Sequence, residues 1–174
     1  GQARERPTPD CRGLRLAVPR TVALDGLDDK VAADFSRAVS RLAAAGATIA
    51  EIDFPEFAEV AALQAKGGIS AAESHAWHRA LIERKADTYD PLVLTRILRG
   101  AEQSAADYIA TITARAALVS RARQRLLGFD ALLMPTVAVL PPRLDAVAAE
   151  SDYLTTNLLV LRNATLINMI DSCA

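Results

Sequence analysis

The first third of the chain contains two short apolar runs separated by one amphipathic segment. Residues 14–18 and 47–54 are largely apolar, each is bounded by a proline, and each predicts a strand. Between them, apolar side chains recur every three or four positions, as on one face of a helix: Val31, Phe35, Val39 and Leu42. We expect this helix to begin at Asp28 or Asp29 and to end at Gly46. Strand, helix and strand with such short connections predict two parallel strands joined by a right-handed crossover.

The middle of the chain is helical in character. Helices are predicted over residues 56–66, 70–84, 91–98 and 104–126. Ser70 with Glu73 has the form of a capping box at the start of the second of these helices, and Ser104 with Asp107 is predicted to cap the fourth. Pro91 stands in the first turn of the third, where its missing N–H does no harm. The inward face of the longest helix is predicted to consist of Ile109, Ile112, Ala116, Val119 and Leu126.

The last third begins with a short apolar segment, residues 129–134, which predicts a buried strand. A proline-rich tract that we expect to be irregular follows to Arg143, and residues 151–172 predict a buried helix whose polar side chains face something specific. Three strands among about seven helices indicate a layered α/β domain. A sheet this small leaves strand edges unpaired, so we expect partner strands to come from residues outside this chain.

Composition narrows the possible partners. The net charge is -1, so the chain lacks the basic field that binding to nucleic acid or to an anionic membrane requires, and a small neutral ligand fits better. No apolar stretch is long enough to span a membrane, and the polar N-terminus does not resemble a secretory signal, so we expect a cytoplasmic protein. Residues 1–12 are predicted to be a linker or a disordered start. Cys11 and Cys173 lie at opposite ends, and both are expected to be reduced thiols.

A search for catalytic constellations finds only weak candidates. Ser74 and His78 could meet on one helix, and His75 with His78 could be proposed as metal ligands, but neither pair has a third member. The segment 67–70 lacks the second serine of a glycine-rich serine loop, so a turn with Ser70 as a helix cap is the better interpretation. The lysines at 30, 66 and 85 lie among polar residues near helix ends, and no nucleophile elbow, dinucleotide motif or phosphate loop is present. We therefore predict no catalytic residue, no metal ligand and no cofactor in this chain.

The order of the segments resembles the amidase-signature family from Gly13 to Ala174. The matching stretches are residues 13–19, 42–47, 52–55, 72–78, 89–91, 106–115, 129–136 and 156–174. By this resemblance, residues 13–174 are the C-terminal part of an amidase-signature domain, an α/β/α sandwich with few strands and many helices. The family's catalytic lysine, its serine in a cis peptide and its nucleophilic serine all precede the matched part, and no residue here corresponds to them.

The resemblance implies the C-terminal part of a hydrolase that cleaves carbon–nitrogen amide bonds through a serine acyl-enzyme. The intact enzyme would act on a small-molecule amide, while this chain alone is expected to be inactive and to expose apolar surface through which it self-associates. It is a possible homo-oligomer, and the amidase component of a transamidation complex is a variant of the same hypothesis. The alternative is a non-catalytic binding or assembly module with the same architecture.

Three residues are predicted to bind substrate, on the strength of the family match. Pro135 and Thr136 follow a buried strand, and ligands gather beyond the carboxyl ends of parallel strands. Asn163 lies on the last predicted helix, six positions after Asn157, so at most one of the two can face a pocket. For Asn163, hydrogen bonding to backbone groups in the core is the competing interpretation.

Overall fold

The computed structural model describes residues 10–173, so most of the predicted N-terminal linker lies outside the described residues. The elements in chain order are β1 (Arg15–Pro19), α1 (Asp29–Ala44), β2 (Thr48–Ile52), α2 (Glu56–Leu63), α3 (Gly68–Lys85), η1 (Ala86–Thr88), α4 (Pro91–Leu98), η2 (Arg99–Glu102), α5 (Ala105–Arg125), β3 (Ala131–Leu132), η3 (Leu144–Val147) and α6 (Glu150–Met169). Within the described residues, no helix is long and apolar enough to cross a bilayer. Both cysteines are free thiols.

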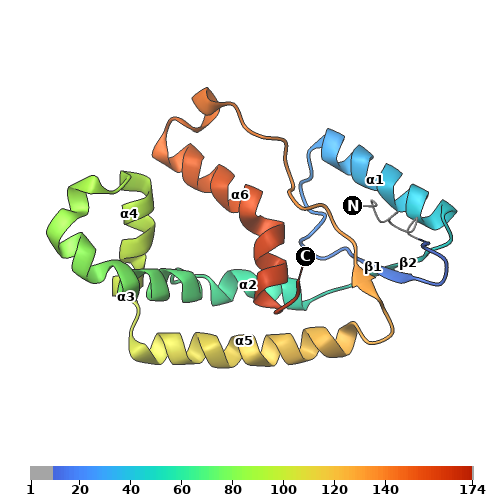
Figure 1. Ribbon diagram of the computed structural model, residues 1–174, viewed down its shortest axis with the longest axis horizontal. Helices are drawn as coiled ribbons and strands as arrows, with labels where there is room; N and C mark the ends of the chain where they lie inside the picture. The colour runs from blue at the N-terminus through green and yellow to red at the C-terminus, as the bar shows by residue number, and fades with distance from the viewer. Residues whose placement is uncertain (1–9, 174) are drawn as a thin grey trace, which may run out of the picture.

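A parallel sheet in the order β2-β1-β3 forms one end of the molecule. The helix α1 lies beside this sheet, whereas α5 runs beneath α2 and reaches the sheet only at its C-terminal end (Figure 1). The chain has the predicted mixed α/β class, with many helices around a small parallel sheet. The third strand is only two residues long, although a strand over 129–134 was expected. Its ladder is extended at each end by a single hydrogen bond, from Asp130 N to Arg15 O and from Leu133 N to Ala17 O, before Pro135 ends the extended segment.

The helix α1 has the predicted start and the predicted apolar stripe. The carboxylate of Asp28 accepts a hydrogen bond from Lys30 N at 2.9 Å, which caps the first turn. Gly46, with φ of 98°, follows the last turn in the left-handed conformation that favours glycine. The four stripe residues are half-buried rather than fully buried, so the helix covers the sheet loosely.

The hydrophobic core lies where α2, α5 and α6 meet the segment that follows β1. Its buried members are Ala23, Phe54, Phe57, Val60, Leu118, Ala122, Leu166, Met169 and Ile170. The prediction for the inward face of α5 was partly wrong, since Ile109 and Ile112 are exposed, whereas Val119 is buried together with its neighbour Leu118. The reason is that α5 extends from α3 to the sheet, and only its second half passes under the core (Figure 1).

The helices α3 and α4 form a lobe at the far end from the sheet (Figure 1). The start of α3 was predicted wrongly: it begins at Gly68, after Gly67 with φ of 91°, and Ser70 lies inside the first turn rather than at a cap. The expected starts of α4 and α5 are confirmed. The Asp90 carboxylate accepts from Leu92 N and Val93 N, and Ser104 with Asp107 forms a complete capping box.

Burial along α6 is one-sided, although this helix was predicted to be buried as a whole. Asn163, Leu166 and Met169 face the core, while Leu158 and Leu161 are exposed. The helix therefore contributes one face to the core and leaves the other uncovered. Its buried polar residue, Asn163, is one of the three predicted site residues.

Candidate functional site

The segments that follow the strands meet at one edge of the sheet, because the carboxyl ends of parallel strands share an edge. These segments are residues 20–28 after β1, 53–55 after β2 and 133–140 after β3. Hydrogen bonds tie the first of them to both others. Phe54 N donates to Thr21 Oγ1 at 3.0 Å, and Asp28 N donates to Ala138 O at 2.9 Å. This edge is therefore a single interconnected surface, and it includes the candidate residues Pro135 and Thr136.

The structure brings two of the three predicted site residues into contact. Asn163 is 1% exposed, and its Nδ2 donates to Pro135 O at 2.8 Å and to Ala23 O at 3.0 Å. Its Oδ1 accepts from Arg162 Nε at 3.0 Å. Pro135 is buried and Thr136, the next residue, is exposed. The amide of Asn163 thus bonds to protein groups at both its nitrogen and its oxygen, as the competing interpretation expected, and Thr136 is the one of the three with a surface open to solvent.

Arg162 belongs to the same cluster, and sequence reasoning did not single it out. Its Nη1 donates to Asp25 O at 2.7 Å and its Nη2 to Ala23 O at 3.3 Å. Burial lowers the pKa of this guanidinium, and the carboxylate of Asp25 partly offsets that effect. The available signal was an arginine beside an asparagine in an otherwise apolar stretch of helix, but nothing in the sequence shows that both side chains turn toward the loop after β1.

The loop after β1 contains a strained turn. Val22 has φ of 63°, and Ala23 N donates to Thr21 O at 2.6 Å across it. This is a three-residue turn with a positive central φ, a rare conformation and an unfavourable one for a β-branched residue. Asn163 and Arg162 both donate hydrogen bonds to Ala23 O, the carbonyl of the residue that follows Val22.

Comparison with known proteins assigns the chain to a family. The family model described as Amidase matches residues 2–174. The chain belongs to the amidase family. The 2-amino-5-chloromuconic acid deaminase of Comamonas testosteroni is 30% identical over 163 residues, which are 94% of this chain and 35% of that protein. A glutamyl-tRNA(Gln) amidotransferase component from Halobacterium salinarum is 28% identical over 159 residues, covering 79% of this chain and 37% of that protein.

A solved relative shows the same fold in amidase-family enzymes. The structure of S177A Kluyveromyces lactis allophanate hydrolase superposes with a TM-score of 0.76 at 25% identity, covering 91% of this chain and 25% of that chain. A crystal structure of an amidase, at 22% identity and a TM-score of 0.69, shares the fold as well. This amidase-family chain spans about a third of the length of the curated relatives that it matches.

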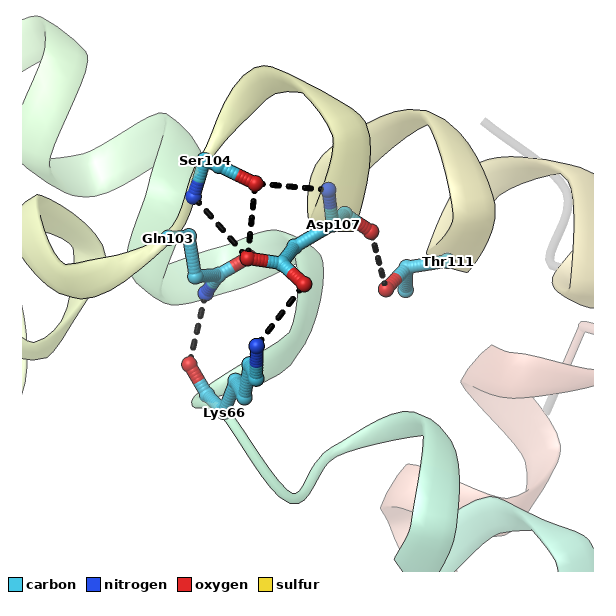
Figure 2. Close-up of polar contacts among 5 residues, drawn as sticks. All are labelled: Lys66, Gln103, Ser104, Asp107 and Thr111. Atoms are coloured by element: carbon cyan, nitrogen blue, oxygen red, sulfur yellow. Dashed lines mark hydrogen bonds and ion pairs between the residues drawn. The ribbon is translucent and has the colours of Figure 1, made fainter.

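A second polar cluster of this amidase-family chain joins the turn before α3 to the start of α5 (Figure 2). Lys66 Nζ donates to Asp107 Oδ1 at 2.8 Å, and Ser104 Oγ donates to Asp107 Oδ2 at 2.8 Å. Gln103 Nε2 donates to Lys66 O at 2.7 Å. The bond from Lys66, followed by those from Ser104, lowers the pKa of Asp107 from its ordinary 3.8 to about 2. Lysine, serine and aspartate meet here, but the lysine is engaged by a carboxylate and the serine by its helix cap, so the cluster is a structural joint.

Among the remaining candidates from the sequence, His78 has a structural partner. His78 Nδ1 lies 2.8 Å from the hydroxyl of Tyr89, and that contact joins the middle of α3 to the turn before α4. Within residues 10–173, no group of histidine, cysteine and acidic side chains could hold a metal ion. No serine hydroxyl among these residues is hydrogen-bonded to a histidine or a lysine.

One buried carboxylate was not anticipated. Glu56 is 2% exposed and pairs with Arg125, which donates from Nε at 2.7 Å and from Nη2 at 2.9 Å. Burial by itself would raise the pKa of Glu56, but the two bonds from Arg125 and a backbone amide outweigh it and hold the pKa below its ordinary value. A shallow depression of about 400 Å³ beside the pair is lined also by Ser120, Arg121 and Gln124. Because Glu56 is fully paired, we assign it to the core.

Proposed function

We propose that this chain is the C-terminal part of an amidase-type hydrolase that cleaves carbon–nitrogen amide bonds through a serine acyl-enzyme. The proposal rests on one observation: the amidase match extends over residues 2–174, although the chain covers only 35% of the length of its deaminase relative. The lysine and serines of the reaction would be supplied by a part of the enzyme outside these 174 residues. The chain itself would supply scaffold and part of the substrate site.

The chemistry requires a serine nucleophile, a group that accepts its proton, and hydrogen-bond donors where the oxyanion develops. Serine would attack the carbonyl carbon of the amide, the amine or ammonia would leave with a proton, and water would then release the acid. Among the described residues, no serine hydroxyl is hydrogen-bonded to a histidine or a lysine, and Ser104 bonds to the Asp107 carboxylate as part of a helix cap; this fits a supporting role. The segments beyond β1 and β3 are where a small-molecule amide would lie against this part of the enzyme.

In this proposal, Pro135, Thr136 and Asn163 form part of the substrate site in different ways. Thr136 is exposed at the sheet edge and can meet a ligand directly. Pro135 and Asn163 are buried and bonded to each other, so they would act by fixing the backbone on which Thr136 stands. Thr136 would then limit the shape of the substrate that fits beside this edge of the sheet, and so contribute to substrate specificity.

A second candidate function is a non-catalytic binding or assembly module. The exposed apolar side chains favour it, since Trp77 is 85% exposed on α3 and Leu158 is 69% exposed on α6. Relatives named as subunits of an amidotransferase also fit assembly with further chains. The first proposal accounts for the same surfaces as faces that contact the rest of the enzyme or a second copy of the chain.

The test compares the 174-residue chain with the same chain extended through its natural upstream coding sequence. Both proteins are assayed for release of ammonia or amine from simple aryl and aliphatic amides, and both are treated with a fluorophosphonate probe. We expect turnover and probe labelling in the extended protein only, with the labelled serine outside these residues. Turnover by the 174-residue chain, with the probe on one of its own serines, would contradict the proposal. An upstream sequence that lacks the catalytic lysine and the glycine-rich serine loop would favour the assembly module.

A further inference from the structure

The strained turn at Val22 lies at the carboxyl end of the central strand. A left-handed β-branched residue persists only where its surroundings over-determine it, and such residues concentrate at functional sites. Here the surroundings come from three directions. Phe54 N bonds to Thr21 Oγ1, the side chain of Val22 packs against the core, and Ala23, which is 0% exposed, is held from α6.

The contacts from α6 converge on both loops of the candidate site. Asn163 Nδ2 donates two hydrogen bonds, one to Ala23 O in the loop after β1 and one to Pro135 O in the loop after β3. Arg162 bonds to Ala23 O and Asp25 O and also orients Asn163 through its Oδ1. The bond from Asp28 N to Ala138 O closes the same pair of loops farther out. One asparagine therefore fixes the spacing between the two segments that would border a ligand.

We propose that Arg162 and Asn163 are positioning residues that hold the Val22 turn and Pro135 at a fixed separation and thereby place Thr136 against the substrate. The inference rests on the proposed amide hydrolysis and deepens it by assigning Asn163 to its own protein rather than to the ligand. Loss of the Asn163 side chain would take from Pro135 O its bond to α6 and leave Ala23 O with only the longer bond from Arg162, and buried carbonyls that lose hydrogen bonds destabilise the folded state. Removal of the asparagine side chain frees the turn to relax and lets Thr136 drift, and displacements of about 1 Å at a site can reduce rates about a hundredfold.

The first experiment measures, without reference to activity, the clasp formed by the hydrogen bonds of Arg162 and Asn163 to Ala23 O, Asp25 O and Pro135 O. In the 174-residue chain, Val22→Gly, Asn163→Ala and the double variant are compared by urea unfolding. While the clasp is intact, glycine relieves the strained φ, which offsets part of the packing that is lost. Without Asn163 the turn has already relaxed, so we expect Val22→Gly to lower the folding equilibrium constant about fivefold to tenfold more in the Asn163→Ala background. Equal effects in both backgrounds would show that Asn163 does not hold the turn.

The second experiment uses the extended enzyme and separates positioning from substrate contact. We expect Asn163→Ala and Thr136→Ala each to lower kcat/KM about tenfold or more per folded molecule, and the double variant to be no worse than the single ones, because Asn163 acts through Thr136. Arg162→Lys keeps the positive charge but loses the several N–H donors of the guanidinium, and it should lower kcat/KM less than Asn163→Ala does. It replaces Asn163→Ala in this test if that variant folds poorly. Asn157→Ala, on the same helix, is the matched control and should change nothing.

The outcomes are distinguishable. Multiplicative losses from Asn163 and Thr136 would mean that each touches the substrate separately, and unchanged kinetics in both would mean that the clasp is only structural; either result overturns the inference. If the unsubstituted extended enzyme hydrolyses no amide, the proposed function fails and the catalytic role of the clasp fails with it. The unfolding experiment then still decides whether Asn163 holds the turn.

Discussion

The two ends of the molecule are stabilised in different ways. At the core end, where α2, α5 and α6 meet the sheet, apolar side chains are fully enclosed, among them Phe54, Phe57 and Leu118. In the helical lobe, formed by α3, α4 and η2 (residues 68–102), few residues are buried, namely Gly68, Ala71, Ile97 and Gly100. Apolar burial thus fixes the end that contains the candidate site, whereas the lobe depends on other contacts.

The lobe is held by close backbone approach and by hydrogen bonds. A Cβ on Gly100 would overlap the carbonyl oxygen of Ala71, so glycine is what lets η2 approach α3. Tyr108 donates to Glu73 at 2.9 Å, and Arg99 donates to Ala65 O at 3.1 Å. Exposed polar contacts contribute little each, so the comparison predicts a lobe that opens before the core end does.

Loss of apolar volume should affect the core end more than the lobe. Leu118→Ala removes a fully enclosed side chain and should cost about 3–4 kcal/mol, whereas Ile97→Ala in the lobe should cost about 2 kcal/mol. Urea unfolding followed by circular dichroism measures both. Hydrogen exchange by peptide should show that Ile97→Ala increases exchange only in residues 68–102, while Leu118→Ala increases it throughout. Global exchange in both variants would mean that the two ends unfold as one unit.

The ion pairs of α5 provide a second comparison, within the core end itself. Arg125→Met leaves the carboxylate of Glu56 buried without its charged partner and should cost about 3 kcal/mol. Arg121→Met is the matched control, because its partner Glu59 is half-exposed, and it should cost about 0.5 kcal/mol. The loss in Arg125→Met should shrink as the pH falls and Glu56 takes up a proton. A loss that is equal in both variants would show that burial of Glu56 has no energetic consequence.

Local patterns predicted the elements well, and long-range contacts were out of reach. The start of α4 at Asp90 and the cap of α5 by Ser104 with Asp107 were predicted correctly because each depends on residues within one turn. The face of α5 was wrong at Ile109, since periodicity locates a stripe but not the length along which a partner covers it.

In the candidate site, too, local patterns could be predicted from the sequence and long-range contacts could not. Pro135 and Asn163 could be proposed, but the bond that joins them spans 28 positions, and the role of Arg162 depends on carbonyls in a loop 137 and 139 positions away. Val22 could not be recognised at all, because an ordinary valine gives no sign of its backbone conformation. The fold was thus more accessible to sequence reasoning than the contacts that position the site.

Glycine substitutions separate backbone approach from backbone conformation. Gly100→Ala introduces a side chain where the backbone of Ala71 leaves no space, and overpacking of this kind should cost about 2 kcal/mol and displace η2 from α3. Gly26→Ala is the control in the loop after β1. Its φ is 55° and a Cβ would meet nothing within 4 Å, so only the conformational cost of about 1 kcal/mol is expected. Thermal unfolding measures the stability of both variants. A smaller loss of stability for Gly100→Ala than for Gly26→Ala would show that the lobe rearranges to accept the added methyl group.

The joint between the lobe and α5 should become weaker in acid. In the folded chain the pKa of Asp107 is lowered to about 2 by the bond from Lys66 and then by those from Ser104, and in the unfolded chain it returns to about 3.8. The folded state therefore binds fewer protons, so this stabilisation is complete above about pH 4 and disappears as the pH falls through about 2. In a titration from pH 6 to pH 2, the stability gap between the unsubstituted chain and Asp107→Asn should narrow over that window. Lys66→Met keeps the carboxylate but removes the main cause of the shift, so an NMR titration should find the pKa of Asp107 nearer 3.8; a pKa that stays near 2 would assign the shift to the helix cap alone.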